Sequence, residues 1–157
     1  MRKSLLFSLL VLFLFACAGA DSITKKSWKN SGNTIRLKDL TARDFQLLDA
    51  GARLQDALEE KISQSSFRLA GENARYTLKY KILEFDEGSR AMRIATFGLS
   101  DSASGLLKVK VGLFRDGDMV GAWTVDSWVK GGVTGGTEDE MFAEAAEEIV
   151  LHLRGDR

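Results

Sequence analysis

The sequence predicts an α+β domain in which two amphipathic helices pack on one face of a mostly antiparallel sheet of about four to six strands. Apolar residues recur at helical spacing in two segments, 47–62 and 142–153. Between them, apolar and polar residues alternate in several stretches that are separated by turn-forming residues. Consecutive strands joined by short turns form antiparallel sheets, and the helices then cover one face.

The first predicted strand is 34–38, where alternation is weak, and a helix follows it. The apolar face of that helix has 4-3-4-4 spacing: Leu47, Gly51, Leu54, Leu58 and Ile62. Asp44 or Asp49 is expected to cap its start. Residues 67–69 are expected to form a short strand.

The clearest strand signal is at 76–83, where aromatic and aliphatic residues alternate with Thr and Lys. Residues 86–89 read as a turn. Residues 90–97 are predicted to return as a strand, and 98–105 to form a polar loop.

A second hairpin is predicted from strands at 107–113 and 119–130. Asp116 and Gly117 lie between them, and Asp-Gly accepts the positive φ of a tight turn. The glycine-rich stretch 131–136 is expected to be a flexible link.

The last helix is predicted to start with a capping box at 137–140. Its apolar stripe consists of Phe142, Ala146, Ile149, Val150 and Leu153.

Residues 1–16 have the pattern of a secretory signal peptide, with Arg2 and Lys3 followed by an uncharged apolar stretch that starts at Leu5. That stretch is too short to span a bilayer, which needs about 20 apolar residues. It ends at 14–17 in Leu-Phe-Ala-Cys, which resembles the bacterial lipobox. The resemblance implies cleavage between Ala16 and Cys17 and lipid attachment to Cys17, although Phe15 departs from the small residue usual there.

Two alternatives remain, an ordinary signal peptide cut near 18–20 and an uncleaved anchor. Cys17 is the only cysteine and has no partner for an intramolecular disulfide, which favours lipidation. The polar segment 17–33 is then expected to be a flexible tether, and 34–157 a single domain. Without residues 1–16 the formal charge is −2, so no broad attraction to nucleic acid is expected.

The sequence offers few groups for catalysis or metal binding. His152 is the only histidine and is expected to be solvated near the end of the last helix, so neither a metal site nor a cofactor is predicted. No Gly-x-Ser-x-Gly motif is present, and the glycine pairs at 131–136 lack the Lys of a phosphate-binding loop. The protein is predicted not to be an enzyme. A hydrolase built on Ser89 or Ser100 is the remote alternative.

Arg90 and Arg93 follow Asp86 and Glu87 closely. Local ion pairing is one interpretation, and contact with an anionic ligand is the other.

Trp123 and Trp128 are five residues apart, so they fall on opposite faces of a regular strand. We expect one of them in the core. Trp128 would then be exposed on the open sheet face, as a candidate partner contact.

The pattern Phe85-x-x-Gly88-Ser89-Arg90-Ala91-x-Arg93, followed by a strand that begins at Gly105, resembles bacterial domain-of-unknown-function family 4410. The resemblance covers about residues 33–154. It implies a lipoprotein, and it implies no catalytic residues because no activity is established for that family.

The function predicted is that of an uncharacterised, membrane-anchored bacterial lipoprotein: a non-enzymatic interaction module of the cell envelope. Its partners would be the membrane, through covalent lipid, and an envelope protein or the cell wall. Binding of a lipid or anionic small ligand in the periplasm is the alternative. Ala18 lacks the aspartate that retains lipoproteins at the inner membrane, so the outer membrane, facing the periplasm, is the expected location.

Overall fold

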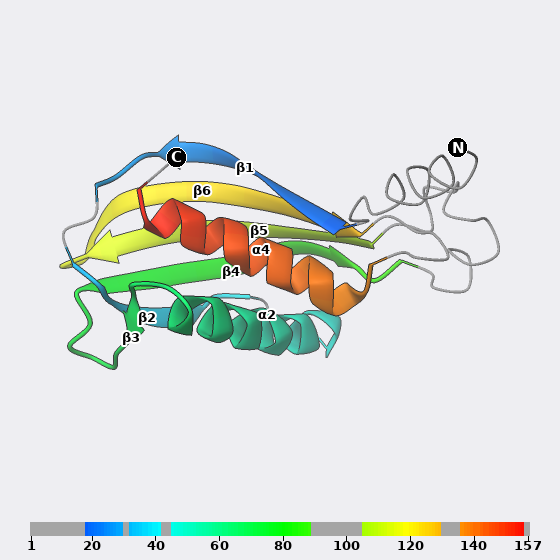
Figure 1. The fold of residues 1–157 in the computed structure, drawn as a ribbon, viewed down its shortest axis with the longest axis horizontal. Helices are drawn as coiled ribbons and strands as arrows, with labels where there is room; N and C mark the ends of the chain where they lie inside the picture. The colour runs from blue at the N-terminus through cyan, green and yellow to red at the C-terminus, as the bar shows by residue number, and fades with distance from the viewer. Residues whose placement is uncertain (1–17, 30–31, 42–44, 89–104, 130–135, 156–157) are drawn as a thin grey trace, which may run out of the picture.

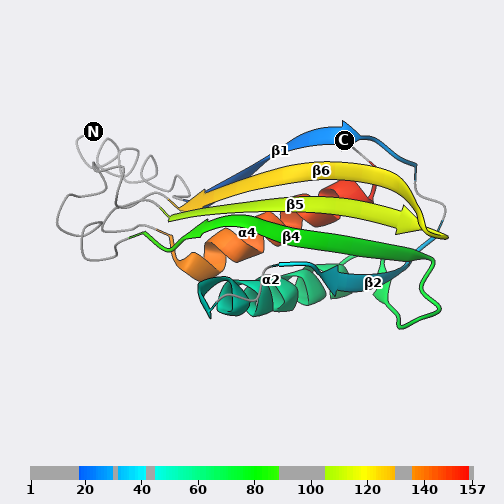
Figure 2. The same ribbon diagram turned by 180° about the vertical axis from the view of Figure 1, so that it is seen from behind.

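The computed structural model has two layers, a six-stranded sheet and two helices that lie on one of its faces (Figure 1). It describes residues 18–29, 32–41, 45–88, 105–129 and 136–155. The opposite face of the sheet carries no described helix and faces the viewer in Figure 2. This arrangement confirms the predicted α+β fold, with two helices on one side of the sheet.

Eight elements follow one another along the chain. They are β1 (Ala18–Lys26), β2 (Thr34–Asp39), α2 (Phe45–Ser63), β3 (Arg68–Leu69), β4 (Tyr76–Asp86), β5 (Gly105–Arg115), β6 (Asp118–Val129) and α4 (Glu138–Leu153). The strands lie in the order β1-β6-β5-β4-β2-β3. β1, β6, β5 and β4 pair antiparallel, whereas β2 runs parallel to both β4 and β3. The sheet is therefore mostly antiparallel, as predicted.

The prediction of a flexible tether at 17–33 is wrong for most of that segment. Residues 18–26 form β1, which pairs with β6 from Ala18 opposite Val129 to Lys26 opposite Ala122. Backbone hydrogen bonds and contacts with α4 hold this polar strand in place, although its side chains supply few large apolar groups.

Two local signals are confirmed. Asp116 and Gly117, with φ of 54° and 91°, form the tight turn between β5 and β6. Thr137 caps α4 by accepting from the Glu140 backbone N–H, while the Glu140 carboxylate accepts from the Thr137 N–H.

Other expectations fare differently. Asp49 lies within α2 and does not cap it, while Asp44 lies outside the described residues. β4 continues to Asp86, so the strand extends beyond its predicted end. The predicted return strand at 90–97, with Ser89 and Ser100, and residues 130–135 of the expected link also lie outside the described part.

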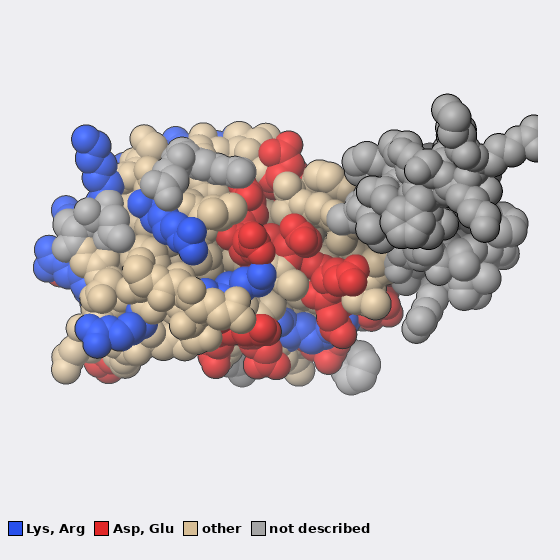
Figure 3. Space-filling view, in the orientation of Figure 1, with Lys and Arg blue, Asp and Glu red and all other residues tan. Residues whose placement is uncertain are grey.

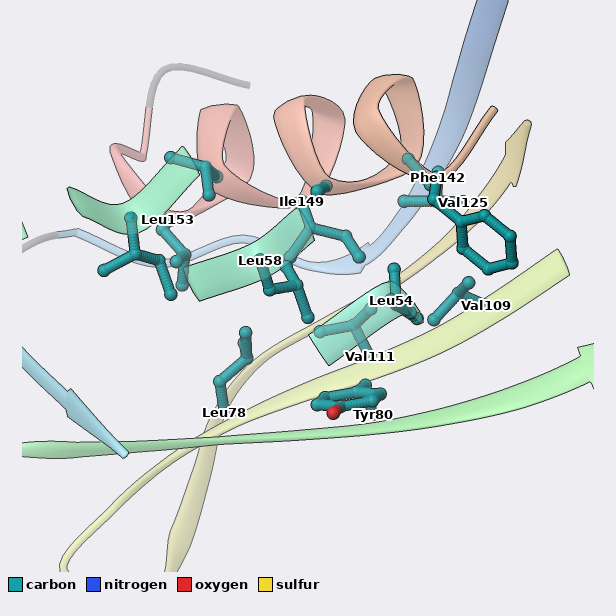
Figure 4. Packing of buried hydrophobic residues seen from close by; sticks show 14 of the residues in the cluster. Leu54, Leu58, Leu78, Tyr80, Val109, Val111, Val125, Phe142, Ile149 and Leu153 are labelled. Atoms are coloured by element: carbon teal, nitrogen blue, oxygen red, sulfur yellow. The ribbon is translucent and has the colours of Figure 1, made fainter. Parts of the chain in front are cut away.

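The core lies between the sheet and the two helices (Figure 4). Leu54 and Leu58 of α2 and Ile149 of α4 project toward the aliphatic and aromatic residues of the central strands. The predicted stripes are confirmed in their main positions, because both leucines and Ile149 are fully buried. Burying one such side chain contributes roughly 1.5–3 kcal/mol, which explains why the strands alternate so regularly.

The helices run side by side in the same direction, with Arg53 bonded to Glu138 and Asp139, and Lys61 to Glu147. The Arg53 guanidinium also lies 4.5 Å from the ring centre of Phe142. Ion pairs thus join α2 to α4 on the solvent side of the helix layer, while apolar residues fill the side that faces the sheet. Within the described part of the chain, no helix is long and apolar enough to cross a membrane.

Candidate functional site

The predicted lipid attachment residue lies immediately before the sheet. Ala16 and Cys17 are outside the described residues, but β1 starts at the next residue, Ala18. Ala18 lies opposite Val129, and Gly19 lies opposite Trp128. An anchor on Cys17 would therefore join the membrane to the folded sheet with almost no free chain between them.

The two tryptophans of β6 lie on opposite faces, as expected. Trp123 is buried, and its ring stacks on His152 with 5.2 Å between ring centres. Trp128 is partly exposed on the open face. A Cβ on Gly19 would lie 3.0 Å from Cζ2 of Trp128. Because glycine has no Cβ, the Trp128 indole ring can lie directly against the backbone of β1.

Arg90 and Arg93 lie outside the described residues, so the structure does not test a ligand contact there. Asp86 accepts a hydrogen bond from the Gly88 backbone N–H at 2.8 Å, which is the local turn contact of a short acidic side chain. Trp128 is the one predicted contact residue that the described chain includes, and its role with a partner stays a prediction.

The expectation of a solvated His152 is wrong. His152 is 3% exposed, and its ring lies between its own helix, α4, and the strands β6 and β1. Its Nε2 is 2.6 Å from Oγ of Ser22 and 3.6 Å from Oε1 of Glu148, while Nδ1 faces Oγ1 of Thr24 at 3.4 Å. The polar side chains of β1, which made that strand resemble a tether, are the partners that let this histidine be buried.

Ser22, Glu148 and His152 include the residue types of a hydrolase triad, but their geometry differs from one. Ser22 Oγ donates its single proton to Glu148 Oε1 at 2.6 Å, so it accepts from Nε2–H of His152. In a triad the histidine instead accepts the serine proton at Nε2, and the acid orients the ring through Nδ1. Here the three groups satisfy one another and attach β1 to α4.

The open face of the sheet is rich in lysine, and four of these residues define what we call the lysine face: Lys38, Lys79, Lys81 and Lys110. Lys38 of β2 lies directly opposite Lys79 of β4, and Lys81 lies directly opposite Lys110 of β5. The alternation of Lys with buried apolar residues at 76–83 and 107–113 carried this signal in the sequence.

The helix layer has the opposite charge. Asp56 and Glu60 of α2 and Asp139 of α4 line an open groove between the two helices, which we call the acidic groove. Figure 3 shows this face, with acidic side chains gathered over the helices. Arg53 is also in the groove, but its guanidinium is bonded to Glu138 and Asp139.

Among the described residues, no group of three or more His, Cys, Asp or Glu side chains is arranged to hold a metal ion. The acidic groove thus has the charge to receive cationic side chains without the ligand cluster of a metal site.

No family model matches the chain, and no curated protein matches it. The resemblance to domain-of-unknown-function family 4410 is therefore not confirmed.

Comparison with solved structures gives a match to the fold. The chain is similar to the PelC dodecamer from Paraburkholderia phytofirmans, with a TM-score of 0.56, 12% identity and coverage of 87% of this chain and 97% of that one. A Xanthomonas campestris protein of family DUF330 matches with a TM-score of 0.47 and 13% identity over 83% of this chain and 86% of its own. A minor lipoprotein from Acinetobacter baumannii matches with a TM-score of 0.46 and 12% identity over 80% and 92%. At 12% identity, the likeness to the PelC structure concerns the fold alone.

Proposed function

We propose that the protein is a lipid-anchored protein of the bacterial cell envelope whose domain is a non-enzymatic interaction module. The observation that carries the proposal is the position of β1, which starts one residue after Cys17 and is paired along its length with β6. A lipid on Cys17 would hold the sheet close to the bilayer surface, and two or three acyl chains give a stable anchor.

The fold supports an interaction role. One sheet face is left open by the described helices, and it carries the lysine face and the partly exposed Trp128. The Paraburkholderia phytofirmans protein with this fold is described as a dodecamer. We propose that this domain likewise acts by association with other protein chains, at the periplasmic side of the outer membrane.

The anchor is tested by the intact mass of the protein extracted from membranes, for wild type and Cys17→Ala. The expected wild-type chain starts at residue 17 and carries added acyl mass, which the variant lacks. Ser8→Ala, which leaves the apolar stretch that starts at Leu5 uncharged, is the control and should resemble wild type. An unmodified chain that starts after residue 17 would show a soluble secreted protein and overturn the anchor.

The non-enzymatic role has its own test at the part-buried contact between Ser22 and His152. A fluorophosphonate probe labels serines that a neighbouring base activates. Wild type is expected to remain unlabelled at Ser22, since its hydroxyl proton is held by Glu148. Labelling that wild type shows and Ser22→Ala loses would overturn the proposal and revive the hydrolase alternative.

A further inference from the structure

The two faces of the domain carry opposite charge, and each is unbalanced on its own. On the open sheet face, no described side chain forms an ion pair with Lys38, Lys81 or Lys110. Lys108 differs, because its ammonium lies 3.4 Å from the Asp126 carboxylate. The lysine face is therefore a patch of positive charge. It lies next to Lys108, whose charge is neutralised by Asp126.

This arrangement is unfavourable for a single domain. Like charges placed directly opposite each other on neighbouring strands destabilise a sheet, and the lysine face contains two such pairs. Lys79 is partly compensated, since its ammonium lies 3.8 Å from the ring centre of Phe114. Lys81 and Lys110 are exposed and have no such contact among the described residues. A negatively charged surface placed against them would remove the repulsion.

The complementary surface is present on the same chain. Asp56 and Glu60 are four residues apart in α2, so both project from one side of the helix into the acidic groove. Their Cβ atoms are expected to be about 5–6 Å apart. Lys81 and Lys110, as directly opposite residues of an antiparallel pair, have nearly the same separation, about 5 Å.

We propose that the lysine face of one copy docks on the acidic groove of a second copy of this chain, with Lys81 and Lys110 meeting Asp56 and Glu60. The proposal rests on the proposed role in association and names its partner and its surfaces. Because the two surfaces lie on opposite sides of the domain, the contact is head to tail. Such an interface closes into a ring or grows into a filament, and it does not end at a two-fold dimer.

The test measures the mass of the detergent-extracted full chain by sedimentation and native mass spectrometry. Wild type is expected to form assemblies larger than a dimer at low salt. They should dissociate as salt rises, because the screening length falls from about 10 Å at 0.1 M to about 3 Å at 1 M.

Charge reversal gives the decisive arms. Lys81→Glu/Lys110→Glu places carboxylates at both sheet positions of the contact, and Asp56→Lys/Glu60→Lys places ammonium groups at both groove positions. Each variant alone should associate about a hundredfold more weakly than wild type, because like charges then meet across the interface. An equal mixture of the two should assemble again with the variants alternating, since each face of one then finds its opposite on the other.

Lys29→Glu is the control for a lysine-to-glutamate charge reversal away from the contact, because Lys29 is exposed in the segment that follows β1, outside the sheet. It should leave assembly unchanged. Circular dichroism of each variant shows whether it is folded.

Three results would overturn the proposal. The first is wild type that stays monomeric at all salt and protein concentrations. The second is a mixture that fails to restore assembly. The third is a lysine face that instead binds an anionic polymer such as heparin, with no effect of Asp56→Lys/Glu60→Lys on mass. None of these results depends on the acyl mass at Cys17, so the proposed lipid anchor is tested independently of the proposed assembly.

Discussion

Ser22 in the first described strand and His152 in the last helix meet with Oγ and Nε2 2.6 Å apart. We expect Ser22→Ala to lower the free energy of unfolding by about 1–3 kcal/mol, because it removes a hydrogen-bond partner from a buried histidine and from Glu148. Urea denaturation measures this loss. Ile23→Thr on the exposed side of the same strand is the control and should change stability by less than about 1 kcal/mol. Equal effects of the two changes would show that the cluster contributes nothing specific.

The turn between β5 and β6 predicts a difference between two glycines. Space is open around the Cβ position of both Gly117 and Gly71, but only Gly117 has a positive φ, of 91°. Gly117→Ala is expected to destabilise the domain by about 1–2 kcal/mol through backbone strain. Gly71→Ala should be neutral or stabilising by up to about 1 kcal/mol, since it restricts the unfolded chain. Thermal unfolding compares them, and identical midpoints would contradict the strain.

The capping box of α4 gives a third expectation. Thr137→Ala removes the side-chain oxygen that accepts from the Glu140 N–H and should cost about 1 kcal/mol of stability. Thr137→Ser keeps that oxygen and should stay within a few tenths of a kcal/mol of wild type. Urea midpoints measure both variants. A serine variant as unstable as the alanine variant would mean that the methyl group matters, not the cap.

Tyr80 makes the stability of the domain depend on pH in alkaline solution. Burial raises the pKa of its hydroxyl well above the ordinary value of 10, and the nearby carboxylates of Asp39, Glu59 and Asp56 act in the same direction. Folding therefore favours the neutral phenol. This contribution is fully present below pH 10 and is lost as the pH rises above 10, where the unfolded chain ionises and the folded one does not.

Tyr80→Phe tests the relationship. The Tyr80 hydroxyl is buried without a hydrogen-bond partner among the described residues, so its removal should be neutral or stabilising at pH 8. Between pH 10 and 11 the free energy of unfolding should fall more steeply for wild type than for the variant. Parallel pH profiles of the two proteins would contradict the assignment to Tyr80.

The parts of the fold that the sequence revealed depend on residues close together in the chain. The Asp116-Gly117 turn and the Thr137 cap each need only a few neighbours, and the stripes of α2 and α4 repeat a simple period. β1 was hidden for the opposite reason. Its helix-side residues are small or polar: Ala18 and Ala20 are only partly buried against the core, and Ser22 faces Glu148 and His152. Neither the strand nor the buried histidine is recognisable without partners that are far apart in the sequence.

The candidate surfaces were partly visible in the same way. Strand alternation places Lys79 with Lys81 and Lys108 with Lys110 on one face. Register decides which of them meet, however, and it separates Lys108, which Asp126 neutralises, from Lys110. The acidic groove depends on how two helices lie against each other, and no pattern in either helix alone specifies that.

The position of β1 also has a consequence for the order of folding. The earliest strand of the described chain completes the sheet by pairing with β6, the last one, so it can dock only after almost all of the domain has been assembled. Contacts this distant in sequence form slowly, because a long loop must close first. Until then the hydrogen-bonding edge of β6 is uncovered, and an uncovered edge can pair with a strand of another chain. We expect the protein to be most prone to aggregation in this brief state, and a leader that delays the docking of β1 would prolong it.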